Sequence, residues 1–146
     1  MNRREELSEE GPLWGQNLIV LQMASLYFWT AFDKSGTPFL SGDRLEAIFN
    51  WGHTNRPVEP FLAVPGFAMA ASVAVVAVEY FLAVGILVRR LAKFAIPAGL
   101  LLHAGFYVLL PVSTYSISMM ALYLVVIHPD ALHRFLDRIQ GRPVSQ

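Results

Sequence analysis

Cysteine is absent from this sequence, and its absence excludes several kinds of chemistry at once. Disulfide bonds, thiolate metal sites and catalytic thiols all need cysteine side chains. Charged residues are scarce as well: they make up 15% of the 146 residues, whereas soluble globular chains have about 25%. The net charge is zero, so the composition gives no indication of a nucleic-acid partner. The sequence also lacks a metal-ligand spacing, a phosphate loop, a nucleophile elbow and a dinucleotide fingerprint.

Hydrophobic residues, by contrast, make up 55% of the chain and gather in long runs. A helix needs about 20 mostly apolar residues to cross the hydrocarbon core of a bilayer. The first run carries no charge, and the second contains one charged residue, Glu79. The pattern predicts a single all-α domain, an integral membrane bundle of about four transmembrane helices at residues 13–32, 61–88, 94–110 and 113–127.

Positive charges in the short loops predict the orientation of this bundle. Arg89, Arg90 and Lys93 lie between the second and third runs, and short cytoplasmic loops are enriched in Lys and Arg. Arginines before the first run and after the fourth agree with this assignment. Both ends are therefore expected to be cytoplasmic, in a multi-pass protein of the cell inner membrane. Two amphipathic segments, 43–51 in the first outer loop and 129–139 in the tail, are expected to lie along the membrane surface.

Polar residues inside the predicted spans indicate where the bundle has an interior. Glu79 lies twelve residues before the expected hairpin tip near Leu91, and His103 lies twelve residues after it. In antiparallel helices this spacing places both side chains at one depth, near the middle of the bilayer. Gln22 falls at a similar level, and Tyr107 lies one turn beyond His103. One interpretation is a proton-handling or headgroup-binding site built from Gln22, Glu79 and His103. The other is an interhelical hydrogen bond between Glu79 and His103 that fixes the helix register.

Lys34 follows the first predicted span directly and also has two interpretations. A lysine at a helix end commonly extends its ammonium group to the membrane surface. A lysine held in a partly dry pocket can instead act as a base. The sequence pattern leaves both interpretations open.

The run from Gln22 to Phe28, followed by Lys34, Phe39 and Gly42, resembles the HTTM membrane domain. That domain is shared by vitamin K-dependent γ-glutamyl carboxylase and many bacterial relatives. The resemblance continues through later residues: Glu79, Arg89, Arg90, His103 and Ile127-His-Pro-Asp130. It covers most of this chain but only the C-terminal part of the family's domain, and the family's first helices and large extramembrane domain have no counterpart in these residues. A weaker similarity, in size, is to the four-span DoxX-type proteins, which are often associated with quinone-linked redox systems.

The resemblance implies a role for Lys34, because a lysine at the matching position of the carboxylase deprotonates a reduced quinone. It implies a quinone as cofactor and Lys34 as a tentative catalytic base, with Glu79 or His103 assisting. The size and the long apolar second span favour a different function, a non-catalytic subunit or partner-binding module of a membrane complex. Its partners would be the lipid bilayer and other membrane subunits or a second copy, and a set of small residues suits such close helix packing: Gly66, Ala70, Ala74 and Ala77. The alternative is a quinone- or isoprenoid-handling enzyme, and the third hypothesis is a small transporter or proton channel.

Overall fold

The structure, a computed structural model, describes residues 14–52, 59–110 and 112–127. Within these residues it is helical and contains no strand, so the predicted all-α fold is confirmed. The helices of the described part of the chain are α1 (Trp14–Lys34), α2 (Thr37–Leu40), α3 (Asp43–Gly52), α4 (Glu59–Leu62), α5 (Phe67–Gly85), α6 (Arg89–Leu109) and α7 (Ser113–Val126). The predicted surface segment 129–139 lies outside the described residues.

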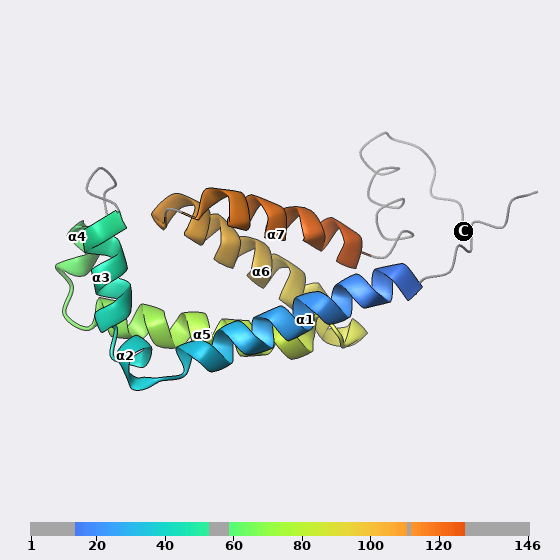
Figure 1. Cartoon of the computed structure of the whole chain (residues 1–146), viewed down its shortest axis with the longest axis horizontal. Coiled ribbons are helices and arrows are strands. Elements are labelled where there is room, and N and C mark those ends of the chain that lie inside the picture. Colours follow the sequence, from blue (N-terminus) through green and yellow to red (C-terminus); the bar gives the residue numbers. More distant parts are fainter. Residues whose placement is uncertain (1–13, 53–58, 111, 128–146) are drawn as a thin grey trace, which may run out of the picture.

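Four long helices form two antiparallel pairs (Figure 1). α1 lies along α5, and α6 lies along α7, while a turn at residues 86–88 joins α5 to α6. The two pairs are close together near this turn and diverge toward α2, α3 and α4. The start of α1 and the end of α7 lie at the end of the molecule opposite to α2–α4.

The hydrophobic core lies where the two pairs meet. It contains buried residues from all four long helices: Met23, Ala24, Tyr27, Leu82, Ala83, Ala95, Met119 and Tyr123. Small residues permit the close approach, since a Cβ atom on Gly85 would lie 2.9 Å from the Cβ of Ala95. A Cβ atom on Gly99 would overlap the hydroxyl of Tyr123. Glycine therefore sets the distance between the helices at this end of the bundle.

The second predicted span is not one continuous helix. α4 ends at Leu62, and residues 63–66 turn before α5 begins at Phe67. Pro65 has no backbone N–H, and Gly66 has a φ of 77°, in the left-handed region, so this pair interrupts the helix. The prediction of one helix over residues 61–88 is therefore wrong at its start, and α5 itself ends at Gly85.

The other long helices follow their predicted spans more closely. α1 covers nearly all of residues 13–32 and continues through Lys34, and α7 covers 113–127 to within one residue. α6 begins at Arg89, five residues before the predicted start of its span. The three basic residues of its first turns are exposed, so their charge does not prevent helix formation there.

The amphipathic segment 43–51 forms α3, but its apolar face packs on protein. Leu45 and Phe49 are buried and contact apolar residues of α4, α5 and the end of α6. Gly42, with a φ of 92°, precedes α3 and lies against the backbone of Met69 in α5. The helix is therefore present as predicted, whereas lipid contact by its inner face is wrong.

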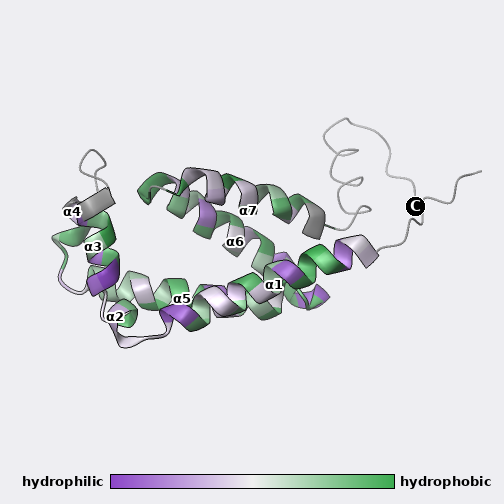
Figure 2. Ribbon diagram, viewed as in Figure 1, coloured by the Kyte–Doolittle hydropathy of each residue, from purple (hydrophilic) through white to green (hydrophobic). Residues whose placement is uncertain are grey.

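α5 and α6 are long and apolar enough to cross a membrane. The core helix of a soluble protein can pass the same test, but here only 28% of the apolar segment of α5 and 17% of that of α6 is buried. Figure 2 shows hydrophobic residues along most of α5. Large apolar side chains are exposed on α1 and α7 too, among them Trp29, Phe32 and Leu124. This exposed apolar surface indicates association with a membrane.

Candidate functional site

The ammonium group of Lys34 forms an ion pair with the carboxylate of Glu79. Lys34 is the last residue of α1, Glu79 lies in the second half of α5, and Lys34 Nζ is 2.5 Å from Glu79 Oε1. The side chain of Glu79 is 4% exposed and that of Lys34 is 26% exposed. A buried carboxylate is costly without a partner, and the end of α1 supplies that partner. The Lys34 side chain therefore turns toward Glu79 in the bundle.

A second group of polar side chains joins three helices through two hydrogen bonds. The hydroxyl of Tyr27 in α1 is 2.8 Å from Nε2 of His103 in α6 and 2.7 Å from the hydroxyl of Tyr123 in α7. Each of the three side chains is at most 1% exposed. Because these bonds connect α1 to both helices of the other pair, they fix the rotation of α1 about its own axis.

The hydrogen bond predicted between Glu79 and His103 does not form. Glu79 Oε1 accepts from Lys34, and His103 Nε2 bonds to Tyr27. The remaining atoms, Glu79 Oε2 and His103 Nδ1, have no hydrogen-bond partner among the residues that the structure describes. The two predicted site residues therefore belong to two separate hydrogen-bonded groups.

Glu79 and His103 nevertheless lie at nearly the same level of the bundle. The close contact of Gly85 with Ala95 places the centre of the hairpin at residue 90, so Glu79 is level with Leu101. His103 is two residues further along, an offset of about 3 Å at 1.5 Å per residue. The equal depth deduced from the hairpin tip therefore agrees with the packing.

Gln22 and Tyr107, the other two predicted site residues, are exposed, unlike the buried cluster formed by Glu79, Tyr27, His103 and Tyr123. Gln22 is exposed on α1, and Tyr107 is 43% exposed on α6. Gln22 lies five residues before Tyr27, which places the two side chains about 140° apart around the helix. Depth alone, the basis for including Gln22, does not determine which face of a helix a residue occupies.

Three tyrosines complete the cluster and were not among the predicted site residues. Tyr27 and Tyr123 supply the hydrogen bonds, and the ring of Tyr115 lies 5.6 Å from that of His103. One signal for Tyr123 was available in the sequence, since it shares a helical face with Ser116 and Met119, and all three are buried. That spacing of three and four residues is the pattern of an inward helix face.

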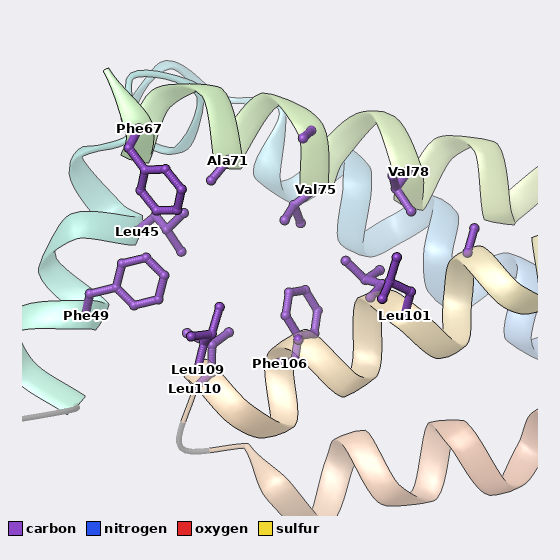
Figure 3. Close-up of a pocket in the computed structure, with 14 residues that line it drawn as sticks. Leu45, Phe49, Phe67, Ala71, Val75, Val78, Leu101, Phe106, Leu109 and Leu110 are labelled. Atoms are coloured by element: carbon purple, nitrogen blue, oxygen red, sulfur yellow. The ribbon is translucent and has the colours of Figure 1, made fainter. Parts of the chain in front are cut away.

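An apolar cavity of about 340 Å³ lies beside the cluster, between α5 and α6 where they diverge (Figure 3). Its walls are apolar side chains, and α3 covers one end with Leu45 and Phe49. Phe106 of α6 lines the cavity, and its ring centroid lies 5.9 Å from Lys34 Nζ and 5.8 Å from the centroid of the His103 ring. One aromatic ring therefore lies both at the wall of an apolar cavity and near the charged and hydrogen-bonding groups.

Comparison with protein-family models, with curated proteins and with solved structures finds no match to this chain. The resemblance to the HTTM domain, and the weaker one to DoxX-type proteins, therefore stay predictions. The chemistry of the site follows from its own geometry: a lipophilic cavity, a cation and hydrogen-bonding side chains within a few ångströms of one another.

Proposed function

We propose that this chain is a multi-pass membrane protein that binds a lipophilic molecule between α5 and α6. In this proposal α1, α5, α6 and α7 are the four spans, and both ends of the chain face the cytoplasm. The exposed apolar side chains on all four helices support the spans, and the basic residues at the start of α6 support the orientation. α7 has 14 residues, about 21 Å of helix, which fits a bundle that is thinner at this edge.

The position of Phe106 is the observation that carries the proposal. On one side its ring borders a cavity of about 340 Å³, which is within the range of pockets that hold small lipophilic ligands. The Lys34 ammonium group and the His103 ring lie within 6 Å of the centroid of the same ring. A ligand with a hydrocarbon body and a small polar head would match this order of surfaces. Quinones and isoprenoid alcohols have that composition.

Lys34 is the group best placed to meet the polar head of such a ligand. Its side chain is 26% exposed, whereas that of Glu79 is 4% exposed, so the ammonium is the accessible half of the ion pair. Donation from Lys34 to a ligand oxygen would leave Glu79 as the group that receives or returns a proton. Lys34 as a catalytic base, which the resemblance implies, is the enzymatic form of this proposal.

The test is binding of two probes, radiolabelled farnesol and a short-chain ubiquinone, to the full chain in nanodiscs. Gly105 lines the cavity and has open space around its Cβ position, so Gly105→Leu fills the cavity without a clash. Gly15→Leu is the matched control, since Gly15 also has open space around it and lies at the start of α1. We expect Gly105→Leu to weaken binding of at least one probe by about tenfold, equivalent to about 1.4 kcal/mol.

Equal affinity of the wild type, Gly105→Leu and Gly15→Leu for both probes would contradict the proposal. Lys34→Met then separates binding from catalysis. If Lys34 only binds the ligand head, the variant loses affinity, whereas a base is required for turnover even when the ligand is saturating.

A second candidate, the subunit or partner-binding module, is favoured by one specific observation. Ala70 and Ala77 are exposed on α5, and Gly66 is exposed just before it, so these small residues are not used for packing within the bundle. Another membrane helix could pack there. Purification in mild detergent followed by mass spectrometry tests this candidate: a stoichiometric protein that Ala70→Leu or Ala77→Leu displaces would support it, and a lone chain would count against it.

A further inference from the structure

Several buried polar side-chain atoms of the long helices have no hydrogen-bond partner. Among the described residues these atoms are Glu79 Oε2, His103 Nδ1, Ser72 Oγ and Ser116 Oγ. All four residues are at most 3% exposed. Buried polar groups in folded proteins are nearly always hydrogen-bonded, either to protein or to ordered water. These atoms therefore require a partner that the side chains alone do not supply.

Two of these atoms belong to residues that both lie near Tyr115, and a third belongs to the next residue along α7. Tyr115 links them: its ring is 5.6 Å from that of His103, the Glu79 charge acts on its phenol, and Ser116 is its neighbour in the chain. Tyr27 bonds to His103 and is within range of the Glu79 charge as well. Ser72 lies seven residues before Glu79 on α5, about 10 Å away along the helix, and is outside this region.

The three remaining atoms have the composition of a water site. Buried waters typically make about three hydrogen bonds to polar groups that would otherwise be unpaired. Glu79 Oε2 accepts, the Ser116 hydroxyl donates or accepts, and His103 Nδ1 does either according to its tautomer. We propose that a water molecule bound by Glu79, His103 and Ser116 joins the two hydrogen-bonded groups into one proton relay from Lys34 to His103.

Proton transfer along this relay conserves atoms and charge without another reactant. When Nε2–H of His103 donates to Tyr27, Nδ1 is an unprotonated acceptor. A proton moves from the Lys34 ammonium group to Glu79, and the Glu79 carboxyl then gives a proton to the water as the water gives one to Nδ1. The products are a neutral Lys34, a Glu79 carboxylate and a His103 imidazolium, and the water is regenerated.

The relay has one accessible end and one buried end. Lys34 is the accessible end, because its side chain is 26% exposed, whereas His103 is 1% exposed. The groups that face His103 are Tyr27 from α1 and Tyr115 and Tyr123 from α7, and the Lys34 charge also acts on its ring. Chains of carboxylates and histidines inside membranes commonly serve as proton pathways. The relay would let the interior of the bundle exchange protons with the end of α1.

The test is NMR of the full chain in nanodiscs with ¹⁵N-labelled histidine and no added lipophilic ligand. The His103 ring signals are assigned by their loss in His103→Gln. We expect a cross-peak between the His103 ring and water, and we expect Glu79→Gln to shift the Nδ1 signal. Ser116→Ala should abolish the water cross-peak, whereas Ser72→Ala, the same change at an equally buried serine two turns from Glu79, should leave it intact.

Far-UV circular dichroism of each variant confirms that its helix content is unchanged. A wild-type spectrum without a water cross-peak would overturn the relay, and so would a cross-peak that Ser116→Ala and Ser72→Ala affect equally. Gly105→Leu is expected to keep the cross-peak. The relay can thus fail while ligand binding stands, or hold while ligand binding fails.

Discussion

The two ends of the α5–α6 hairpin are built differently although the same two helices form both. Near the turn, Gly85 of α5 meets Ala95 of α6, and further along α6 Gly99 meets Tyr123 of α7. At the other end bulky residues such as Phe67 and Leu109 face each other across an open cavity that α3 covers (Figure 3). We refer to these regions as the closed end and the open end.

In the ligand-binding proposal, this difference separates the residues that stabilise the bundle from those that line the binding site. Lipid is as apolar as leucine, so helices in a bilayer associate through close packing and hydrogen bonds rather than through hydrophobic burial. The closed end supplies both, since Ala95 is fully buried and Tyr123 bonds to Tyr27. The open end has neither between α5 and α6, which leaves space for a ligand at little cost to the fold.

The largest effect is expected from adding a single methyl group at the closed end. Gly99→Ala would place a Cβ atom on the hydroxyl and ring of Tyr123, so the ring must move and its hydrogen bond to Tyr27 is lost. We expect a loss of about 3 kcal/mol in the free energy of unfolding, the upper part of the range for overpacked cores. Unfolding by sodium dodecyl sulfate, followed by far-UV circular dichroism, measures it.

Gly105→Ala is the matched control on the same helix. No atom lies within 4 Å of its Cβ position, and alanine is the better helix former. We expect its stability to equal or exceed that of the wild type. Equal losses in the two variants would mean that α6 does not approach α7 as closely as the contact of Gly99 with Tyr123 indicates.

A smaller difference is expected when the same leucine truncation is made at each end. Leu82 is 0% exposed at the closed end, and Leu109 lines the cavity at the open end. Leu82→Ala leaves a new void, and we expect it to cost about 2 kcal/mol, because the packing loss remains while the transfer term is small in a bilayer. Leu109→Ala only enlarges an existing cavity and should cost less than about 1 kcal/mol.

The same detergent unfolding assay compares these two leucine variants. A loss in Leu109→Ala as large as that in Leu82→Ala would show that the open end is packed as tightly as the closed end. It would remove the cavity on which the ligand proposal depends.

The sequence was sufficient to predict the long helices and one feature of the site, the common level of Glu79 and His103. Long apolar runs reveal helices directly, and counting from the hairpin tip placed Glu79 and His103 at one level because the rise of a helix is constant. The break before α5 was also readable, since Pro65 and Gly66 are adjacent. A span predicted from hydrophobicity alone does not reveal such a break in the helix.

The hydrogen-bonded pairs of side chains could not be predicted from the sequence, because they depend on the rotation of each helix about its own axis. Lys34 reaches Glu79, and Tyr27 reaches His103, only because α1 turns the same face toward α5, α6 and α7. Depth placed Gln22 at the level of the site, but rotation places it on the exposed face. The cavity depends on the divergence of α5 from α6, and no local pattern encodes that angle.

The most local effect is expected at the open end, where α3 is held against α5 through Gly42. Its φ of 92° and its contact with the Met69 backbone leave no room for a side chain. We expect Gly42→Ala to cost more than the penalty of about 1–2 kcal/mol for a left-handed conformation, because its Cβ atom would also overlap the Met69 backbone. The change should loosen α3 rather than the whole bundle. Gly36→Ala is the matched control, because its Cβ would make only an ordinary contact of 3.6 Å.

Because the chain has no cysteine, a single introduced thiol reports on α3 without background. Phe49→Cys places it on the buried face that covers the cavity, and Ile48→Cys places it on the exposed face. Maleimide should label Phe49→Cys slowly in the parent and in Gly36→Ala, and faster in Gly42→Ala, with Ile48→Cys fast throughout. If Gly42→Ala left the labelling of Phe49→Cys unchanged while farnesol binding fell, α3 would not be the cover of the cavity. The binding loss would then have to come from a shift of α5 itself, which the same thiol placed at Ala71 would detect.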